Sequence, residues 1–64
     1  MNRRQFEKIL NHVINSIESA GYEAENQIIA YVLTGDDSYI TRRGDAREWI
    51  QKLDKEQIKD YYGL

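Results

Sequence analysis

Apolar and polar residues alternate with a helical period over the first third of the chain. Between residues 3 and 20, large apolar side chains recur every three or four positions and share one helical face: Phe6, Ile9, Leu10, Val13 and Ile17. This pattern predicts an amphipathic helix over residues 3–20. Gly21 predicts its end, because glycine readily adopts the positive φ that is common just past a helix.

A second, more apolar segment lies between Gly21 and Gly35. One helical face of this segment carries Ala24, Ile28, Tyr31 and Val32. Ile29 and Leu33 widen the apolar arc, and an arc this wide is usually buried by more than one neighbour. We therefore predict a central helix over residues 25–34 that the rest of the chain wraps. The short link after Gly21 predicts that the first two helices are antiparallel neighbours.

Residues 34–44 form the longest stretch without a helical period. Tyr39 and Ile40 are its large apolar side chains, and we expect both to anchor this stretch to the body of the protein. Ser38 is a candidate start for a single helical turn.

Two capping signatures divide the last third of the chain. Asp45-x-x-Glu48 predicts the start of a third helix, with the Asp45 carboxylate accepting N–H groups of the first turn. Asp54-x-x-Gln57 repeats the signature, so we predict that the helix breaks and restarts near Asp54. The whole pattern predicts an all-α fold, a compact bundle of three to four short helices.

The chain has 64 residues, which we interpret as one helical domain over residues 1–64. A core this small rarely supplies more than ~3–5 kcal/mol of folding stability, so small proteins usually need a further source of stability, such as a disulfide, a bound metal or a second subunit. The sequence has no Cys and one His, which leaves no disulfide and no thiolate or His-based metal site within one chain. We therefore expect a homodimer, and we expect no cofactor.

The net charge of −2 argues against the basic face that nucleic-acid binders carry. No apolar run approaches the ~20 residues of a membrane span. Arg3 and Arg4 precede an amphipathic pattern rather than the apolar core of a signal peptide. We expect a cytoplasmic protein without membrane insertion. A small helical nucleic-acid-binding domain is the alternative, and DNA binding that weakens steeply with salt would distinguish it.

The densest basic cluster is the main candidate for chemistry, and it consists of Arg42, Arg43 and Arg47. Arginine binds phosphate or carboxylate in bidentate geometry, so these residues, with Tyr39, are candidates for partner binding. The alternative is that internal ion pairs hold the stretch to the third helix through the nearby carboxylates of Asp36, Asp37 and Asp45.

The remaining polar groups have plainer interpretations. His12 projects away from the apolar stripe and is predicted to be a solvated surface side chain. The pair Asp36 and Asp37 lacks the alternating carboxylates of a calcium loop and is predicted to be a solvated turn. No nucleophile–base pair or glycine-rich phosphate loop can be argued, so we predict a protein that is not an enzyme.

Five tyrosines and one tryptophan exceed what a core of this size can hide. Tyrosine and tryptophan are enriched at protein interfaces, which is a second reason to expect a partner. We assign core or dimer-contact roles to Ile28, Tyr31, Val32 and Trp49.

One run of the sequence carries a specific family resemblance. It reads Gly21-Tyr22, then Asn26-Gln27-Ile28-Ile29-Ala30-Tyr31-Val32-Leu33-Thr34-Gly35-Asp36, then Tyr39-Ile40-x-Arg42 and Ala46-Arg47. This run resembles the IreB family of small regulatory phosphoproteins of Gram-positive bacteria. The resemblance implies a cytosolic, non-enzymatic homodimer that acts downstream of a membrane Ser/Thr kinase sensing cell-envelope stress. That kinase is the implied class of protein partner.

The resemblance also implies a phosphorylatable threonine segment ahead of the first helix, whereas residues 1–6 contain neither Thr nor Ser. Within residues 34–44 the hydroxyl side chains are Thr34, Ser38 and Thr41. A phosphate on Thr34 would meet the negative end of the central helix, which is disruptive. A phosphate on Thr41 would find Arg42 and Arg43 beside it. Thr41 is therefore the candidate phosphosite.

Overall fold

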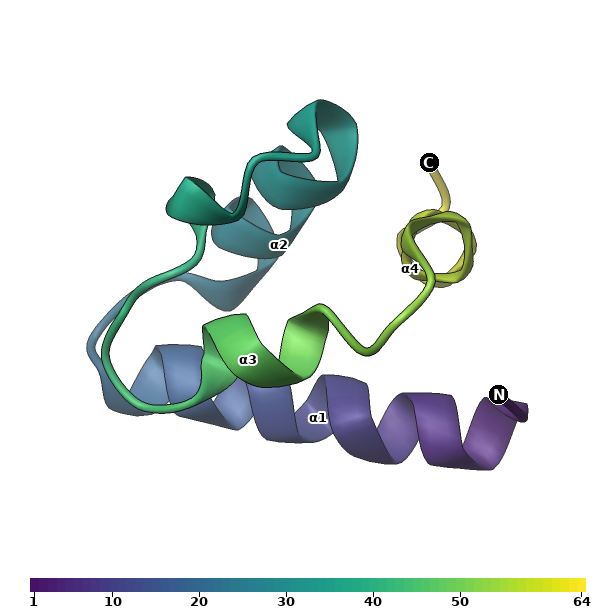
Figure 1. The fold of residues 1–64 in the computed structure, drawn as a ribbon, viewed down its shortest axis with the longest axis horizontal. Helices are drawn as coiled ribbons and strands as arrows, with labels where there is room; N and C mark the ends of the chain where they lie inside the picture. The colour runs from purple at the N-terminus through teal and green to yellow at the C-terminus, as the bar shows by residue number, and fades with distance from the viewer.

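Four α-helices and one short 3-10 turn form the regular structure of the computed structural model, which describes residues 1–64 (Figure 1). In chain order the elements are α1 (Arg3–Ser19), α2 (Ala24–Thr34), η1 (Asp37–Tyr39), α3 (Ala46–Ile50) and α4 (Lys55–Tyr62). No strand forms, so the predicted all-α bundle is confirmed. None of the helices combines the length and the apolarity that crossing a membrane requires.

α1 is the longest helix, and α3 is the element that packs most extensively on it. The buried side chains of α1 follow the predicted stripe and are Phe6, Leu10, Val13 and Ile17. Ala46 and Ile50 of α3 are fully buried. In Figure 1, α3 lies directly over α1, whereas α2 leaves the end of α1 and rises away from it. The predicted contact between the first two helices is present, and α3 packs on α1 more extensively than α2 does.

α2 contacts α1, η1 and α4, so several neighbours cover its wide apolar arc, as predicted. Its buried side chains are Ala24, Ile28, Tyr31 and Val32. Leu33 differs from the prediction, because its side chain is 64% exposed. The neighbouring elements fill the other sides of α2 and leave Leu33, in its last turn, facing solvent.

The core consists of 13 buried side chains, all of them apolar. The stretch between α2 and α3, which we call the connecting segment (residues 35–45), contributes Ile40, whose side chain is fully buried. Tyr39 is 49% exposed, so Ile40 is the one side chain of this segment in the core, and the prediction of two apolar anchors is wrong in that respect. Polar contacts from neighbouring helices hold the same segment, from Arg47 to the Ile40 carbonyl and from Gln27 to the Thr41 N–H.

The two predicted capping signatures have different outcomes. Asp54 Oδ1 accepts the N–H of Glu56 at 3.1 Å, which confirms the predicted restart of the chain as α4. Asp45 makes no capping hydrogen bond to α3. The predicted capping box at Asp45 is therefore wrong, because its carboxylate contacts His12 of α1 instead.

A short turn follows α2, close to the predicted position. Gly35 ends α2 with φ +76°, and its N–H donates to the carbonyl of Tyr31 at 2.7 Å. η1 begins at Asp37, one residue before the predicted start at Ser38. The Asp36 carboxylate accepts the N–H of Ser38 at 2.9 Å, which fixes the start of the turn.

Candidate functional site

Two side chains from neighbouring helices hold the connecting segment in place. The Arg47 guanidinium of α3 donates two hydrogen bonds to the carbonyl of Ile40, from Nε at 3.1 Å and from Nη2 at 2.8 Å. The Gln27 side chain of α2 accepts the N–H of Thr41 through Oε1 at 2.9 Å. The backbone at residues 40–41 is therefore fixed from both sides by partly buried contacts.

The predicted arginine cluster separates into one structural residue and two exposed ones. Arg47 binds the Ile40 carbonyl, whereas Arg42 and Arg43 are exposed. None of the three ion pairs joins an arginine of this cluster to Asp36, Asp37 or Asp45, so the alternative of internal ion pairs is wrong. The reason is that the aspartates have other partners. Asp37 Oδ2 accepts from Gln51 Nε2 at 2.9 Å. Asp36 accepts the N–H of Ser38, and Asp45 contacts the His12 ring. The pKa of Asp36 is lowered chiefly by its hydrogen bonds with Ser38, and the charge of Arg47 adds to this effect.

The three hydroxyl side chains of residues 34–44 differ in what they contact. The Thr34 hydroxyl donates to the carbonyl of Ala30 at 2.7 Å, one turn back in α2. Thr41 is partly buried, and its Oγ1 accepts the N–H of Arg43 at 3.1 Å. Ser38 is exposed. The hydrogen bond from the Ser38 N–H lowers the pKa of the Asp36 carboxyl, so this turn carries a negative charge at neutral pH.

The residues assigned to core or dimer contacts fall into two groups. Ile28, Tyr31 and Val32 lie in the core of the chain itself. Trp49 is half-buried and packs on the rim of that core. Of the four, Trp49 alone offers surface to a partner, together with the half-exposed Tyr39 of the candidate binding group.

His12 and Asp45 form a contact that joins α1 to the start of α3. His12 Nε2 lies 2.9 Å from Asp45 Oδ2, and both side chains are about half exposed. This hydrogen bond is the main cause that lowers the pKa of the Asp45 carboxyl. His12 therefore lies at the surface, as predicted, and in addition it has a carboxylate partner that the sequence pattern did not indicate. Only the fold brings the two residues together, because they are 33 positions apart and no helical spacing relates them.

A shallow cleft of about 200 Å³ lies beside this pair and is lined by Lys8, Ile9, His12 and Trp49. The lining is largely apolar. The Trp49 ring meets the His12 ring edge-on, with centroids 5.6 Å apart. The ammonium of Lys52 lies 5.4 Å from the centroid of the same Trp49 ring. Sequence periodicity placed Ile9 and Trp49 on buried faces and gave no signal that they line a cleft.

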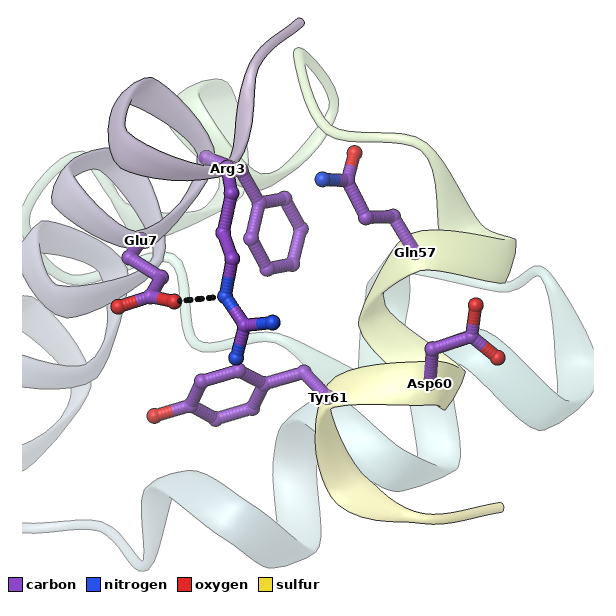
Figure 2. Close-up of a pocket in the computed structure, with 6 residues that line it drawn as sticks. Arg3, Glu7, Gln57, Asp60 and Tyr61 are labelled. Atoms are coloured by element: carbon purple, nitrogen blue, oxygen red, sulfur yellow. Dashed lines mark hydrogen bonds and ion pairs between the residues drawn. The ribbon is translucent and has the colours of Figure 1, made fainter.

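A second hollow, of about 220 Å³, lies between the first turns of α1 and the side of α4 (Figure 2). Arg3 Nε donates to Glu7 Oε2 at 2.7 Å, and Figure 2 shows the guanidinium beside the ring of Tyr61. Tyr62, which follows Tyr61 in the chain, is half-buried, and burial raises its pKa to about 12. The Arg3 side chain is 85% exposed, and exposed ion pairs of this kind contribute little to stability. This hollow contains no nucleophile beside a base.

Comparison with protein families gives a match over nearly the whole chain. The model of the family described as IreB regulatory phosphoprotein matches residues 1–61. The matched range includes α1, α2, the connecting segment, α3 and most of α4.

Proposed function

The chain belongs to the IreB regulatory phosphoprotein family, and from this membership we propose that it regulates a target by binding another protein rather than by catalysis. The observation that carries the proposal is the family match, because it spans nearly the whole chain. The finer part of the proposal is that the chain acts in the cytoplasm, downstream of a membrane Ser/Thr kinase that senses cell-envelope stress. The resemblance of residues 21–53 to the family pattern supports this finer part.

The proposed binding face consists of Tyr39, Arg42 and Arg43 on the connecting segment. All three side chains are exposed, and neither arginine has a carboxylate partner within the chain. The backbone beneath them is held by Arg47 and Gln27, so a partner would lose little free energy in ordering it. Two arginines beside a tyrosine suit a partner surface that carries carboxylates or phosphates.

A binding measurement with the kinase tests this proposal. The purified chain would be titrated against the kinase domain of the envelope-stress Ser/Thr kinase from the same organism. We expect Arg43→Glu to weaken binding at least tenfold, because it reverses one charge of the proposed face. Arg4→Glu is the matched control, since Arg4 is also exposed but lies at the opposite end of α1 from the connecting segment. Equal effects of the two substitutions would contradict the proposed face.

We also propose that Thr41 is the phosphosite. Arg42 and Arg43 follow it directly, and the N–H of Arg43 already contacts its hydroxyl oxygen. Incubation with the kinase domain and mapping by mass spectrometry should place phosphate on Thr41 and show none in Thr41→Ala. Phosphate on Thr34 alone, or no phosphate on the chain, would contradict Thr41 as the phosphosite.

The nucleic-acid alternative is not proposed. With a net charge of −2 and Arg47 bound to a carbonyl, two loop arginines are left in this cluster for phosphate contacts. Affinity for nucleic acid comes largely from many such contacts.

The proposal includes a homodimer at micromolar concentration. The single chain leaves large apolar side chains exposed, among them Tyr22, Leu33 and Tyr61, each 45% or more exposed, and covering part of this surface is what a second copy would provide. Sedimentation equilibrium should give twice the 7.6 kDa of the chain. A folded species of 7.6 kDa at that concentration would contradict the dimer.

A further inference from the structure

The cleft lined by Lys8, Ile9, His12 and Trp49 is distinct from the proposed binding face, and its dimensions suit one side chain. Its volume of about 200 Å³ lies below the ~300–1,000 Å³ typical of small-molecule sites. Ile9 and Trp49 pack on the core from its rim, so the floor of the cleft is continuous with the core. A single large apolar side chain would fill this space and extend that packing.

The floor of the cleft is already ordered. The His12 ring rests edge-on against Trp49, and Asp45 fixes the His12 ring through its 2.9 Å contact. Lys52 lies against the Trp49 ring as well, 5.4 Å from its centroid. Tryptophan held in one orientation loses little conformational entropy when a partner covers it, so binding here does not first require rearrangement.

The charges around the cleft favour a bound peptide with acidic residues on either side of its apolar side chain. Lys8 lines the cleft, and Lys52 lies against its tryptophan. Neither lysine belongs to any of the three ion pairs. No carboxylate lines the cleft: Asp45 is hydrogen-bonded to His12, and Glu48, which precedes Trp49, is not among the lining residues. Two ammonium groups beside an apolar floor are complementary to an apolar residue flanked by carboxylates.

We propose that this cleft binds the apolar anchor residue, leucine or aromatic, of an acidic peptide segment in a partner protein. The inference rests on the proposed role as a protein-binding module and adds a second contact face to it. The anchor residue would pack on Ile9 and Trp49, and the flanking carboxylates would meet Lys8 and Lys52.

Trp49 is the only tryptophan of the chain, so its fluorescence reports directly on this cleft. The probe is a nine-residue peptide with a central leucine and glutamates on both sides. We expect a saturable blue shift of the emission with this peptide. Binding should be at least tenfold weaker with a peptide that has serine in place of leucine, and with one that has lysines in place of the glutamates.

Charge reversals separate this cleft from the binding face on the connecting segment. Lys8→Glu and Lys52→Glu should each weaken peptide binding at least fivefold, whereas Arg43→Glu, an equal change of charge, should alter it less than twofold. Circular dichroism of each variant checks that the helices persist. Equal weakening by all three substitutions, or none by the lysine variants, would overturn the proposal. So would an emission shift that follows protein concentration without peptide, because a second copy would then occupy the cleft.

The two proposals fail separately in these experiments. Loss of kinase binding in Arg43→Glu with intact peptide binding supports both faces. If Lys8→Glu and Lys52→Glu leave peptide binding unchanged, the proposed role of the cleft is wrong, and the kinase measurement still tests the binding face on the connecting segment.

Discussion

His12 and Asp45 are 33 positions apart in the chain, yet Nε2 of one lies 2.9 Å from Oδ2 of the other. The contact joins the middle of α1 to the residue that precedes α3. Because the Asp45 carboxylate is engaged there, it does not cap α3. A side chain in a capping position can therefore serve tertiary packing instead of the helix that follows it.

The stability of this contact should depend on pH through Asp45. Its pKa is lowered from the ordinary value of 3.8, chiefly by the hydrogen bond to His12. A carboxyl with a lowered folded-state pKa stabilises the fold above its unfolded pKa, and this stabilisation is lost as the pH falls through the folded value. We expect Asp45→Asn to melt at a lower temperature than wild type at neutral pH, and the difference to shrink below pH 3.8. Thermal melts across this range measure it.

Asp36 provides the control for that measurement. Its pKa is also lowered, but chiefly by the hydrogen bond from Ser38. Asp36→Asn should therefore show the same dependence on pH whether or not His12 is present. In a His12→Ala background the pH-dependent effect of Asp45→Asn should largely disappear, because His12 is the largest cause of the lowered pKa of Asp45, whereas the effect of Asp36→Asn should be unchanged. An Asp45 effect that keeps its full pH dependence after His12→Ala would show that Ser16, which also lowers the pKa of Asp45, is its main cause instead.

Replacement of Val32 by aspartate should abolish folding. Val32 is 4% exposed, and an unpaired buried carboxylate costs several kcal/mol against a total stability of ~3–5 kcal/mol. Asn26→Asp is a matched control, since Asn26 is exposed on the same helix and belongs to none of the proposed contacts. Circular dichroism should show loss of helix for the first variant and a native spectrum for the second. Similar melting of both would contradict the assigned face of α2.

Removal of the Arg47 side chain should destabilise the protein without affecting any charge pair. The Ile40 carbonyl would lose both of its guanidinium donors, and an unsatisfied buried acceptor costs about 1–3 kcal/mol. In a domain of this size, 1 kcal/mol lowers the melting temperature by roughly 4–8 °C. Arg47→Lys should not restore it, because lysine lacks the planar fork. Arg43→Ala, at an exposed position, should melt like wild type.

Substitution of Gly44 should combine backbone strain with a steric clash. Gly44 has φ +71°, a conformation that costs other residues about 1–2 kcal/mol, and an added Cβ would lie 2.6 Å from Ser16 Oγ. Gly21→Ala, at φ +90° with nothing within 4 Å, should show the strain alone. Gly44→Ala should therefore be the more destabilising in urea. Ser16→Ala should recover part of that loss, and strict additivity of the two changes would exclude the clash.

The helices could be predicted from the sequence because their signals are local. The apolar period of α1 and the glycine after α2 each lie within a few residues of the element that they define. The contacts that shape the candidate site are not local. Gln27 meets Thr41, and His12 meets Asp45, only after the helices pack. The exposure of Leu33 likewise depends on which neighbours cover α2, and this information is absent from its own periodicity.

The contacts of the connecting segment also limit how fast a reaction at Thr41 can proceed. Thr41 is partly buried, its N–H donates to Gln27, and its hydroxyl oxygen accepts from Arg43. A modifying enzyme must hold the surrounding backbone in its own cleft, which requires this stretch to leave these partners first. The frequency of opening, rather than the reactivity of the hydroxyl, would then limit the rate. Gln27, 14 positions earlier on α2, would thus influence the rate of modification at Thr41 without contacting the enzyme.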